Sequence, residues 1–195
     1  YIRNSNHFVP HFQIPLQTGT NRILKLMKRR YLRELYIDRV NTIKTLMPHC
    51  CIGVDVIVGF PGETEEDFLE TYNFLNELDI SYLHVFTYSE RANTAASEMG
   101  DSVPMKIRSE RSRMLRSLSE KKRRKFYEEH LGKSDVVLWE NDQEEGNMLG
   151  FTSNYIKVSA KYDPIRINEI ERVELKAINH LGKVEVEENN STVLA

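Results

Sequence analysis

The sequence predicts an α/β domain followed by a small all-β domain. Three strand–helix repeats alternate through residue 130, and from about Gly132 the pattern changes to short apolar segments separated by turn residues. The charge changes at the same place. Residues 101–130 hold ten Lys or Arg against five Asp or Glu, whereas residues 131–195 hold seven against twelve. We therefore expect two domains, at residues 1–130 and 131–195.

Composition excludes several classes of protein. The 195 residues are 40% hydrophobic and 29% charged, which is too apolar for a disordered chain. No run of about 18 apolar residues occurs, as a membrane span would require. The only cysteines, Cys50 and Cys51, are adjacent, so they predict neither a disulfide framework nor a set of metal ligands. We expect a cytoplasmic protein.

The first repeat is indicated by a strand at residues 11–16, a turn at Gly19 and helical spacing over residues 21–27. A second helix follows and ends at Pro48, which cannot continue it. Its apolar positions recur every three or four residues, at Tyr36, Val40, Ile43 and Met47. Such a one-sided stripe is typical of a helix that packs on a sheet.

The second repeat begins with a strand at residues 52–58, whose apolar run predicts burial on both faces except at Asp55. Thr64 then caps a helix, because acidic residues in the first turn complement the exposed amides and the helix dipole. The apolar stripe of this helix is Phe68, Tyr72, Leu75 and Leu78.

The third repeat has a strand at residues 82–86, where we expect His84 to be a buried core histidine. Pro104 opens a long helix that ends near Gly132. Its expected core positions are Ile107, Met114, Leu115 and Leu118. The helix also contains an unbroken basic run at residues 121–125, which indicates either a solvated face or a contact with a polyanion.

The C-terminal part is expected to be all β and about sixty residues long, a size typical of small RNA-binding barrels. Its short apolar segments are Val136–Trp139, Met148–Val158, Ile165–Ala177 and Val184–Val186.

Candidate binding groups follow the first two strands. Parallel α/β folds bind ligands at the carboxyl ends of their strands, where Gln17 and Thr18 follow the first strand and the Gly59–Glu63 loop follows the second. A tight turn without a ligand is the alternative for that loop. A buried Asp55 needs a polar ligand or an ion pair with Arg29 or Arg30.

These motifs together resemble the radical S-adenosylmethionine (SAM) methylthiotransferases. The segments that carry the resemblance are His11–Thr20, Met27–Tyr31, Asp55–Thr64, Phe86–Arg91 and, in the β segment, Gly150–Tyr155, which is similar to a TRAM domain. Lys28 to Tyr31 resemble the branch that methylthiolates N6-threonylcarbamoyladenosine at position 37 of tRNA. The branches that act on isopentenyladenosine-tRNA and on ribosomal protein S12 remain open, as do a non-catalytic RNA-binding module and a metabolic TIM-barrel enzyme.

The resemblance implies that residues 1–130 are half of a TIM-type barrel, three of six strand–helix units, and that residues 131–195 are an RNA-binding TRAM barrel. The parent enzyme would use SAM and two [4Fe–4S] clusters, one of them held by three closely spaced cysteines. Those cysteines are absent from this sequence. We therefore expect a fragment that is inactive alone and contains no catalytic or metal-ligating residue.

The resemblance also indicates binding residues. For SAM they are Gln17, Thr18, Arg30, Asp55, Gly59, Phe86 and Tyr88. For the anticodon loop of tRNA they are Lys121, Lys122, Arg123, Arg124, Asn154, Tyr155 and Lys157. A half barrel would also expose two sheet edges and an apolar inner face around Ile14, Val56 and Val85 or their alternating neighbours, so we expect self-association.

Overall fold

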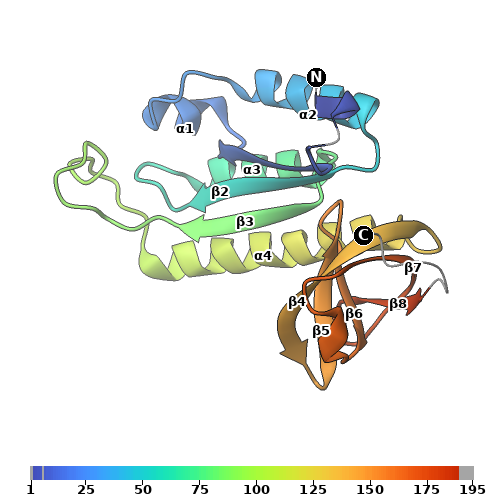
Figure 1. Cartoon of the computed structure of the whole chain (residues 1–195). Coiled ribbons are helices and arrows are strands. Elements are labelled where there is room, and N and C mark those ends of the chain that lie inside the picture. Colours follow the sequence, from blue (N-terminus) through green and yellow to red (C-terminus); the bar gives the residue numbers. More distant parts are fainter. Residues whose placement is uncertain (1, 6, 189–195) are drawn as a thin grey trace. The chain divides into compact units, whose positions relative to one another are not determined.

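The structure, a computed structural model, describes residues 2–5 and 7–188 and forms two compact units (Figure 1). Of the described residues, 12–48 and 52–122 form the α/β unit, and 2–5, 7–11, 49–51 and 123–188 form the barrel unit. A domain boundary at residue 130 stays a prediction. Within the described part, no helix is both long and apolar enough to cross a membrane.

The α/β unit is built on a three-stranded sheet with the order β1 (His11–Gln17), β2 (Cys51–Val58) and β3 (Tyr82–Thr87). Strands β2 and β3 are parallel, with Asp55 opposite His84. Helices α1 (Asn21–Leu26) and α2 (Arg33–Leu46) connect β1 to β2, α3 (Glu65–Glu77) connects β2 to β3, and α4 (Met105–Glu128) follows β3. The expected α/β class with parallel strands is confirmed.

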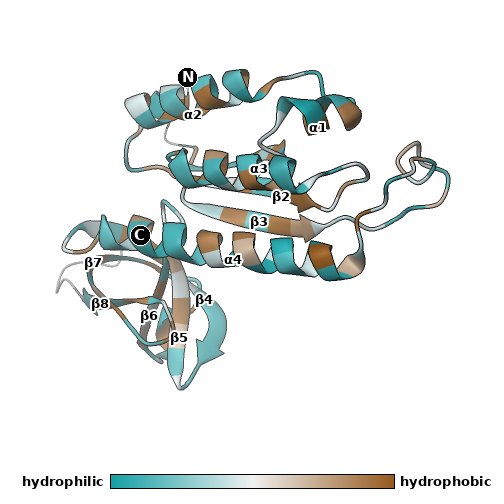
Figure 2. Ribbon diagram, turned by 180° about the vertical axis from the view of Figure 1, so that it is seen from behind, coloured by the Kyte–Doolittle hydropathy of each residue, from teal (hydrophilic) through white to brown (hydrophobic). Residues whose placement is uncertain are grey.

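The two faces of this sheet differ. Helix α3 lies behind the sheet in Figure 1 and in front of it in Figure 2, which is the view from the opposite side. Strand residues on the helix-covered face are buried, among them Val54, Val56 and Val85. Their alternating neighbours Asp55 and His84 lie on the uncovered face, where the side chain of His84 is 53% exposed. The prediction that His84 is a core residue is therefore wrong.

Helices α2 and α3 pack on the sheet through the expected stripes. In α2, Tyr36 and Val40 are buried, and the Tyr36 hydroxyl donates to the Ile14 carbonyl at 2.7 Å. Burial raises the pKa of that hydroxyl. In α3, Phe68 and Leu75 are buried, and Thr64 forms the predicted cap as one half of a capping box with Asp67.

Helix α4 differs from the expectation on its core face. Leu115 and Leu118 are buried, but Ile107 and Met114 are partly exposed. Two arginines, Arg108 and Arg111, occupy the corresponding turns and are 3% and 4% exposed. The sequence interpretation missed them because arginine is rarely buried unless it is paired.

The barrel unit contains a closed barrel with the strand order β4-β5-β6-β8-β7. Its strands are β4 (Ser134–Glu144), β5 (Asn147–Thr152), β6 (Lys157–Lys161), β7 (Ile170–Ile178) and β8 (Val184–Glu188). Short 3-10 helices lie at Ile2–Asn4 and Pro164–Arg166. The expected segment 148–158 is thus two strands joined by a turn, in which Tyr155 has a positive φ of 68°.

The barrel core is centred on Trp139, which is fully buried. Its ring nitrogen donates to Glu171 at 2.9 Å, and the Arg166 guanidinium lies 4.7 Å from the ring centroid. On the neighbouring strand, a Cβ at Gly150 would lie 2.6 Å from the Leu138 carbonyl oxygen, so only glycine lets the two strands approach here. The all-β prediction for this segment is confirmed.

Candidate functional site

A line of polar side chains crosses the uncovered face of the sheet. The Tyr82 hydroxyl donates to the side-chain oxygen of Gln13 at 2.9 Å, and the side-chain nitrogen of Gln13 donates to Asp55. His84 Nδ1 lies 3.6 Å from Asp55 Oδ1. Gly53 makes this line possible, because a Cβ at that position would overlap both Gln13 and Tyr82. All three strands thus contribute to one polar strip.

Asp55 therefore has polar partners, but not the predicted ones. Among the described residues it forms no ion pair with Arg29 or Arg30, and its side chain is 24% exposed. Phe86, on the same face of β3, is 52% exposed. An aromatic ring beside an oriented carboxylate on an uncovered face has the chemistry needed to bind a nucleoside.

Three of the expected SAM residues meet at the carboxyl ends of the strands. Gln17 ends β1, Gly59 follows β2 and Tyr88 follows β3, with the Tyr88 amide donating to the Val58 carbonyl at 2.9 Å. The Tyr88 hydroxyl is buried, and no described residue hydrogen-bonds to it. A buried hydroxyl without a partner is costly, so this atom fits a role in ligand binding.

Two other expected residues are placed differently. Thr18 is 1% exposed and its hydroxyl lies 3.0 Å from that of Thr71 in α3, so it ties the loop after β1 to that helix. Arg30 lies in the exposed segment between α1 and α2. The structure records no contact between Arg30 and the other expected SAM residues.

Gly59 is explained by a neighbouring arginine. It has a φ of +76°, and a Cβ there would lie 2.8 Å from Cδ of Arg108 and closer still to Cγ. The Gly59 amide donates to Glu63 at 3.1 Å. Arg108 in turn donates to the Val103 carbonyl at 2.6 Å and to the Tyr88 carbonyl at 2.8 Å, so it fixes both ends of the loop between β3 and α4.

Arg108 also binds Glu90 in that loop, with 2.5 Å between Nη2 and Oε1. This hydrogen bond holds the pKa of Glu90 at about 2, below its usual 4.5. A depressed carboxyl pKa stabilises the folded state above pH 4.5, and that stabilisation is lost as the pH falls from 4.5 towards 2.

We therefore expect Glu90→Gln to lower the unfolding temperature at pH 7 by a small amount, on the order of 1 to 2 °C. The difference from the wild type should shrink as the pH falls from 4.5 to 2. Thermal unfolding followed by circular dichroism over this range measures it, with Glu98→Gln in the same loop as the control. A difference that does not change with pH would contradict the role of Glu90.

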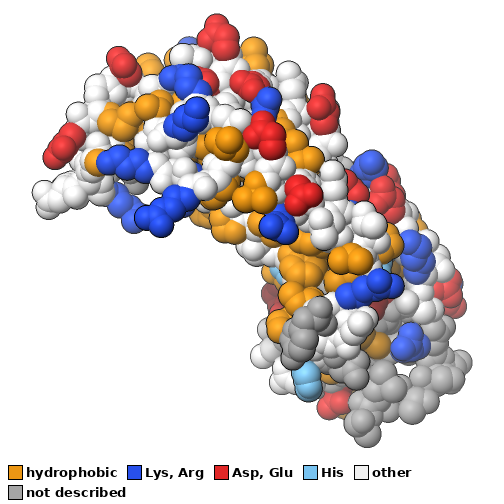
Figure 3. Space-filling model, turned by 90° about the horizontal axis from the view of Figure 1, so that it is seen from above, with side chains coloured by type: hydrophobic (Ala, Val, Ile, Leu, Met, Phe, Trp, Pro, Cys, Tyr) orange, Lys and Arg blue, Asp and Glu red, His pale blue; other side chains and the backbone are white. Residues whose placement is uncertain are grey.

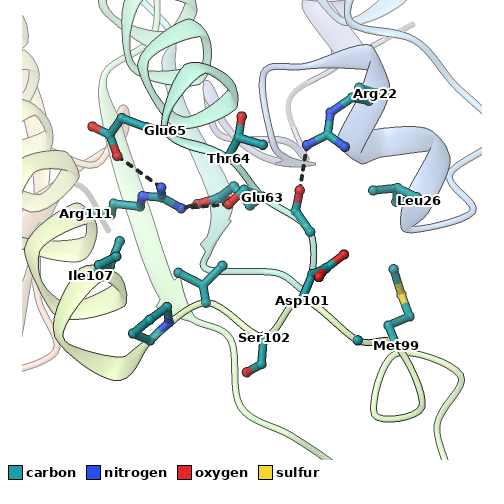
Figure 4. Close-up of a pocket in the computed structure, with 14 residues that line it drawn as sticks. Arg22, Leu26, Glu63, Thr64, Glu65, Met99, Asp101, Ser102, Ile107 and Arg111 are labelled. Atoms are coloured by element: carbon teal, nitrogen blue, oxygen red, sulfur yellow. Dashed lines mark hydrogen bonds and ion pairs between the residues drawn. The ribbon is translucent and has the colours of Figure 1, made fainter.

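A pocket of 790 Å³ is lined by Gly62 and Glu63 at the end of the loop after β2, together with residues of the loop before α4 (Figure 4). On one side Arg111 donates to the buried Glu63 at 2.5 Å and to Glu65 at 3.1 Å. Burial raises the pKa of Glu63, although the Gly59 amide and Arg111 both favour its carboxylate. Across the pocket, Arg22 donates to the Gly62 carbonyl at 2.6 Å. Acidic and basic groups in this pocket are largely paired with each other.

The barrel unit carries a stack of rings. His11 and Tyr155 have their ring centroids 4.1 Å apart and 4° from parallel, and Tyr155 and Phe151 follow at 4.6 Å and 15°. The Lys157 ammonium lies 5.5 Å from the Phe151 centroid and pairs with Asp142 at 3.3 Å. Aromatic rings next to a lysine are typical of surfaces that bind single-stranded RNA.

The expected RNA residues of the barrel unit therefore differ in exposure. Tyr155 is 43% exposed, although both of its ring faces contact other rings. Asn154 is 2% exposed, accepts from Thr152 at 2.6 Å and donates to the His49 carbonyl at 3.0 Å. Asn154 thus shapes the turn that presents Tyr155.

The basic run of α4 is only partly available to a ligand. The Lys122 ammonium donates to the Leu78 carbonyl at 2.8 Å and so binds the C-terminal end of α3. Arg124 pairs with Glu128 at 2.8 Å. Lys121 and Arg123 are exposed. On the face shown in Figure 3, basic and acidic side chains both occur, and acidic groups lie near several of the basic ones.

The chain's own residues do not fit an iron–sulfur cluster. Cys50 and Cys51 are adjacent, and each is at most 1% exposed. Among residues 2–5 and 7–188 there is no group of three or more His, Cys, Asp or Glu side chains placed to hold a metal ion. A cluster needs several thiolates at a fixed spacing, which two adjacent cysteines cannot supply.

Comparison with known proteins defines the class. Residues 1–75 match the family described as the radical SAM superfamily. The resemblance to radical SAM methylthiotransferases is confirmed by the chain's relatives. This chain is 48% identical over 157 residues to the threonylcarbamoyladenosine tRNA methylthiotransferase MtaB of Aquifex aeolicus. The alignment covers 80% of this chain and 37% of that protein.

Two further relatives bear the same kind of name. The MtaB protein of Bacillus subtilis is 39% identical over 89% of this chain and 40% of its own length. The tRNA-2-methylthio-N(6)-dimethylallyladenosine synthase of Pelotomaculum thermopropionicum is 40% identical over 75% of this chain and 33% of its own length. The chain thus spans at most about two fifths of these relatives.

Proposed function

We propose that this chain is part of an enzyme that methylthiolates C2 of N6-threonylcarbamoyladenosine at position 37 of tRNA. The observation that carries the proposal is the 48% identity to a protein named for threonylcarbamoyladenosine. The relative named for dimethylallyladenosine is 40% identical and keeps that substrate as the second candidate. A cytoplasmic location and the anticodon loop of tRNA as partner follow from the same proposal.

The two units would divide the work. In the proposal, the α/β unit is half of a TIM-type barrel and forms one wall of the SAM site, and the barrel unit is a TRAM domain that binds RNA. The polar strip of Gln13, Asp55 and His84 supports the first part, because it lies on the sheet face opposite helix α3. The ring stack with Lys157 supports the second.

The radical chemistry would be supplied by SAM and by iron–sulfur clusters whose ligands are not among these residues. The chain's own residues would bind and orient. Asp55 would accept from a ribose hydroxyl, Tyr88 would donate to a polar atom of SAM, and Phe86 would lie against the adenine. Without cluster ligands, the chain alone should be inactive.

The test of the proposed substrate is an analysis of modified nucleosides. The complete gene that encodes this chain should be expressed in a bacterium lacking its own threonylcarbamoyladenosine methylthiotransferase. Liquid chromatography and mass spectrometry of the tRNA should then detect the 2-methylthio derivative of threonylcarbamoyladenosine. Methylthiolation of dimethylallyladenosine alone would favour the second candidate. The absence of both products would refute the proposal.

The role of Asp55 is tested by SAM affinity. In the complete protein we expect Asp55→Asn to weaken SAM binding about 10- to 150-fold, since a hydrogen bond to a charged group is worth about 1.5 to 3 kcal/mol. Binding of tRNA should change little. Isothermal titration of SAM measures the first effect, and Asp38→Asn on the exposed side of α2 is the matched control. Equal affinities for SAM in the two variants would refute the role.

A further inference from the structure

A second pocket of the α/β unit is lined only by polar and charged residues. It has a volume of 390 Å³ and lies where β3 ends against α4. Its lining consists of Thr87, Ser109, Ser112, Arg113, Arg116, Ser117 and Glu120. The lining side chains thus carry four hydroxyls, two guanidinium groups and the carboxylate of Glu120.

The pocket follows from the spacing of residues on α4. Residues 109, 113, 116 and 120 recur at intervals of four, three and four, which places them on one side of the helix. Thr87 is the last residue of β3, so the pocket lies at the carboxyl end of that strand. That is the end of a parallel strand at which α/β proteins bind ligands.

The arginines of α4 are of two kinds. Arg108 and Arg111 are buried and paired with Glu90 and Glu63. Arg113 and Arg116 are exposed, and within the described part of the chain no carboxylate lies within 4.0 Å of either. Exposed arginines that no carboxylate neutralises are available to an anion from outside the chain.

Arg116 is held in place without using all its donors. Its Nε donates to Ser112 at 3.2 Å and its Nη2 donates to the Val85 carbonyl at 3.4 Å. These contacts fix the plane of the guanidinium, and the group has five N–H donors in total. Ser109 donates to the Met105 carbonyl at 2.9 Å, so its hydroxyl hydrogen is already used within the helix.

We propose that this pocket binds a backbone phosphate of the RNA substrate. Guanidinium groups bind phosphate oxygens through paired hydrogen bonds, and the hydroxyls of Thr87 and Ser117 in the same lining can add further donors. The inference rests on the proposed function, because RNA supplies the phosphate. It assigns to RNA binding two arginines that lie outside the basic run at residues 121–125.

The test is the salt dependence of RNA binding by the full chain. A fluorescently labelled anticodon stem-loop of tRNA is titrated between 50 and 300 mM KCl with the wild type, Arg113→Gln and Arg113→Gln/Arg116→Gln. Each lost phosphate contact lowers the slope of log affinity against log salt by about 0.7 to 0.9. The double variant should therefore lose about 1.4 to 1.8 from the slope, which corresponds to a loss of affinity of about 25- to 60-fold at 0.1 M salt.

Controls separate this inference from the proposed function. Lys25→Gln/Arg39→Gln removes the same charge from exposed positions on α1 and α2 and should leave the slope within about 0.3 of the wild type. Arg113→Gln removes no recorded contact, so the variant should fold as the wild type does. Its slope should fall by half as much as the slope of the double variant. Circular dichroism checks the fold of each variant.

Each outcome of the titration either supports or overturns the phosphate site. A reduced slope in both pocket variants but not in the control supports the phosphate site. RNA binding with an unchanged slope in the pocket variants overturns the site and leaves the proposed function standing. If the wild type does not bind the stem-loop, both the RNA role and this inference fail. Titration of inorganic phosphate then shows whether the pocket takes a free anion instead.

Discussion

Arg111→Met is expected to destabilise the α/β unit by about 3 to 5 kcal/mol, because it leaves the buried carboxylate of Glu63 without its cation. Both side chains are at most 5% exposed, so water cannot replace the lost partner. The Gly59 amide, 3.1 Å from Glu63, is too weak a substitute for a full charge.

The measurement is urea unfolding followed by far-ultraviolet circular dichroism, which reports the helices of the α/β unit. Trp139, the chain's single tryptophan, lies in the barrel unit, so its fluorescence follows that unit separately. The control is Arg124→Met, which breaks an exposed ion pair with Glu128 and should cost no more than about 0.5 kcal/mol. Similar losses in the two variants would contradict the prediction.

The pH dependence identifies the cause. Without Arg111 the pKa of Glu63, already raised by burial, rises further above its usual 4.5. A raised carboxyl pKa means that the folded state binds the proton more tightly than the unfolded state. The penalty of Arg111→Met should therefore be largest at neutral pH and shrink as the pH falls towards 4.5. Glu63→Gln/Arg111→Met, which has no buried charge, should show no such recovery.

Gly59→Ala is expected to cost about 2 to 5 kcal/mol through two separate effects. A left-handed conformation costs a residue with a Cβ about 1 to 2 kcal/mol, and Gly59 has a φ of +76°. The new methyl group would also overlap Arg108, whose guanidinium is fixed by hydrogen bonds and cannot move aside. Forcing an atom into a filled space costs about 1 to 3 kcal/mol more.

The neighbouring Gly62 provides a control for the backbone effect. Its φ is +81°, but a Cβ there would lie 3.6 Å from the nearest atom, Leu26 Cδ1. Gly62→Ala should therefore cost only about 1 to 2 kcal/mol. Adding Arg108→Ala to Gly59→Ala should cost less than the sum of the two single changes, because the overlap is gone. Equal losses for Gly59→Ala and Gly62→Ala would show that the overlap with Arg108 is unimportant.

Local patterns predicted the elements of the fold well. Three correct predictions depend on residues close together in sequence. They are the cap at Thr64, the apolar stripe of α3 and the change from helices to short strands after Gly132. The exact split of residues 148–158 into β5 and β6 was not predicted, because the turn contains no glycine or proline. Tyr155 adopts the positive φ of that turn instead.

The faces of the sheet were harder to predict. An apolar strand with one polar residue suggests burial on both sides, and so His84 was expected in the core. Which side the helices cover depends on how three strands far apart in sequence pair, and the partner of Asp55 proved to be Gln13, 42 residues away. No local pattern contains that information.

The buried arginines had a signal that was overlooked. Arg108 and Arg111 continue the spacing of Leu115 and Leu118 on α4, at intervals of three, four and three. The core positions expected for α4 were apolar residues only, so both arginines were left out. Two arginines in register with a leucine stripe indicate that a carboxylate is buried beside them, as Glu63 is beside Arg111.

Each compact unit is assembled from separate stretches of chain, because the chain passes between the units after residues 11, 48, 51 and 122. A graft of the barrel unit onto another protein could not be made by joining genes at one point. A junction at residue 130 would leave behind the Tyr127 hydroxyl, which accepts from the Lys157 amide at 3.1 Å, and the His49 carbonyl that holds Asn154. Exchange between relatives should therefore succeed only when the segments around His11, His49 and Tyr127 are exchanged together with the barrel.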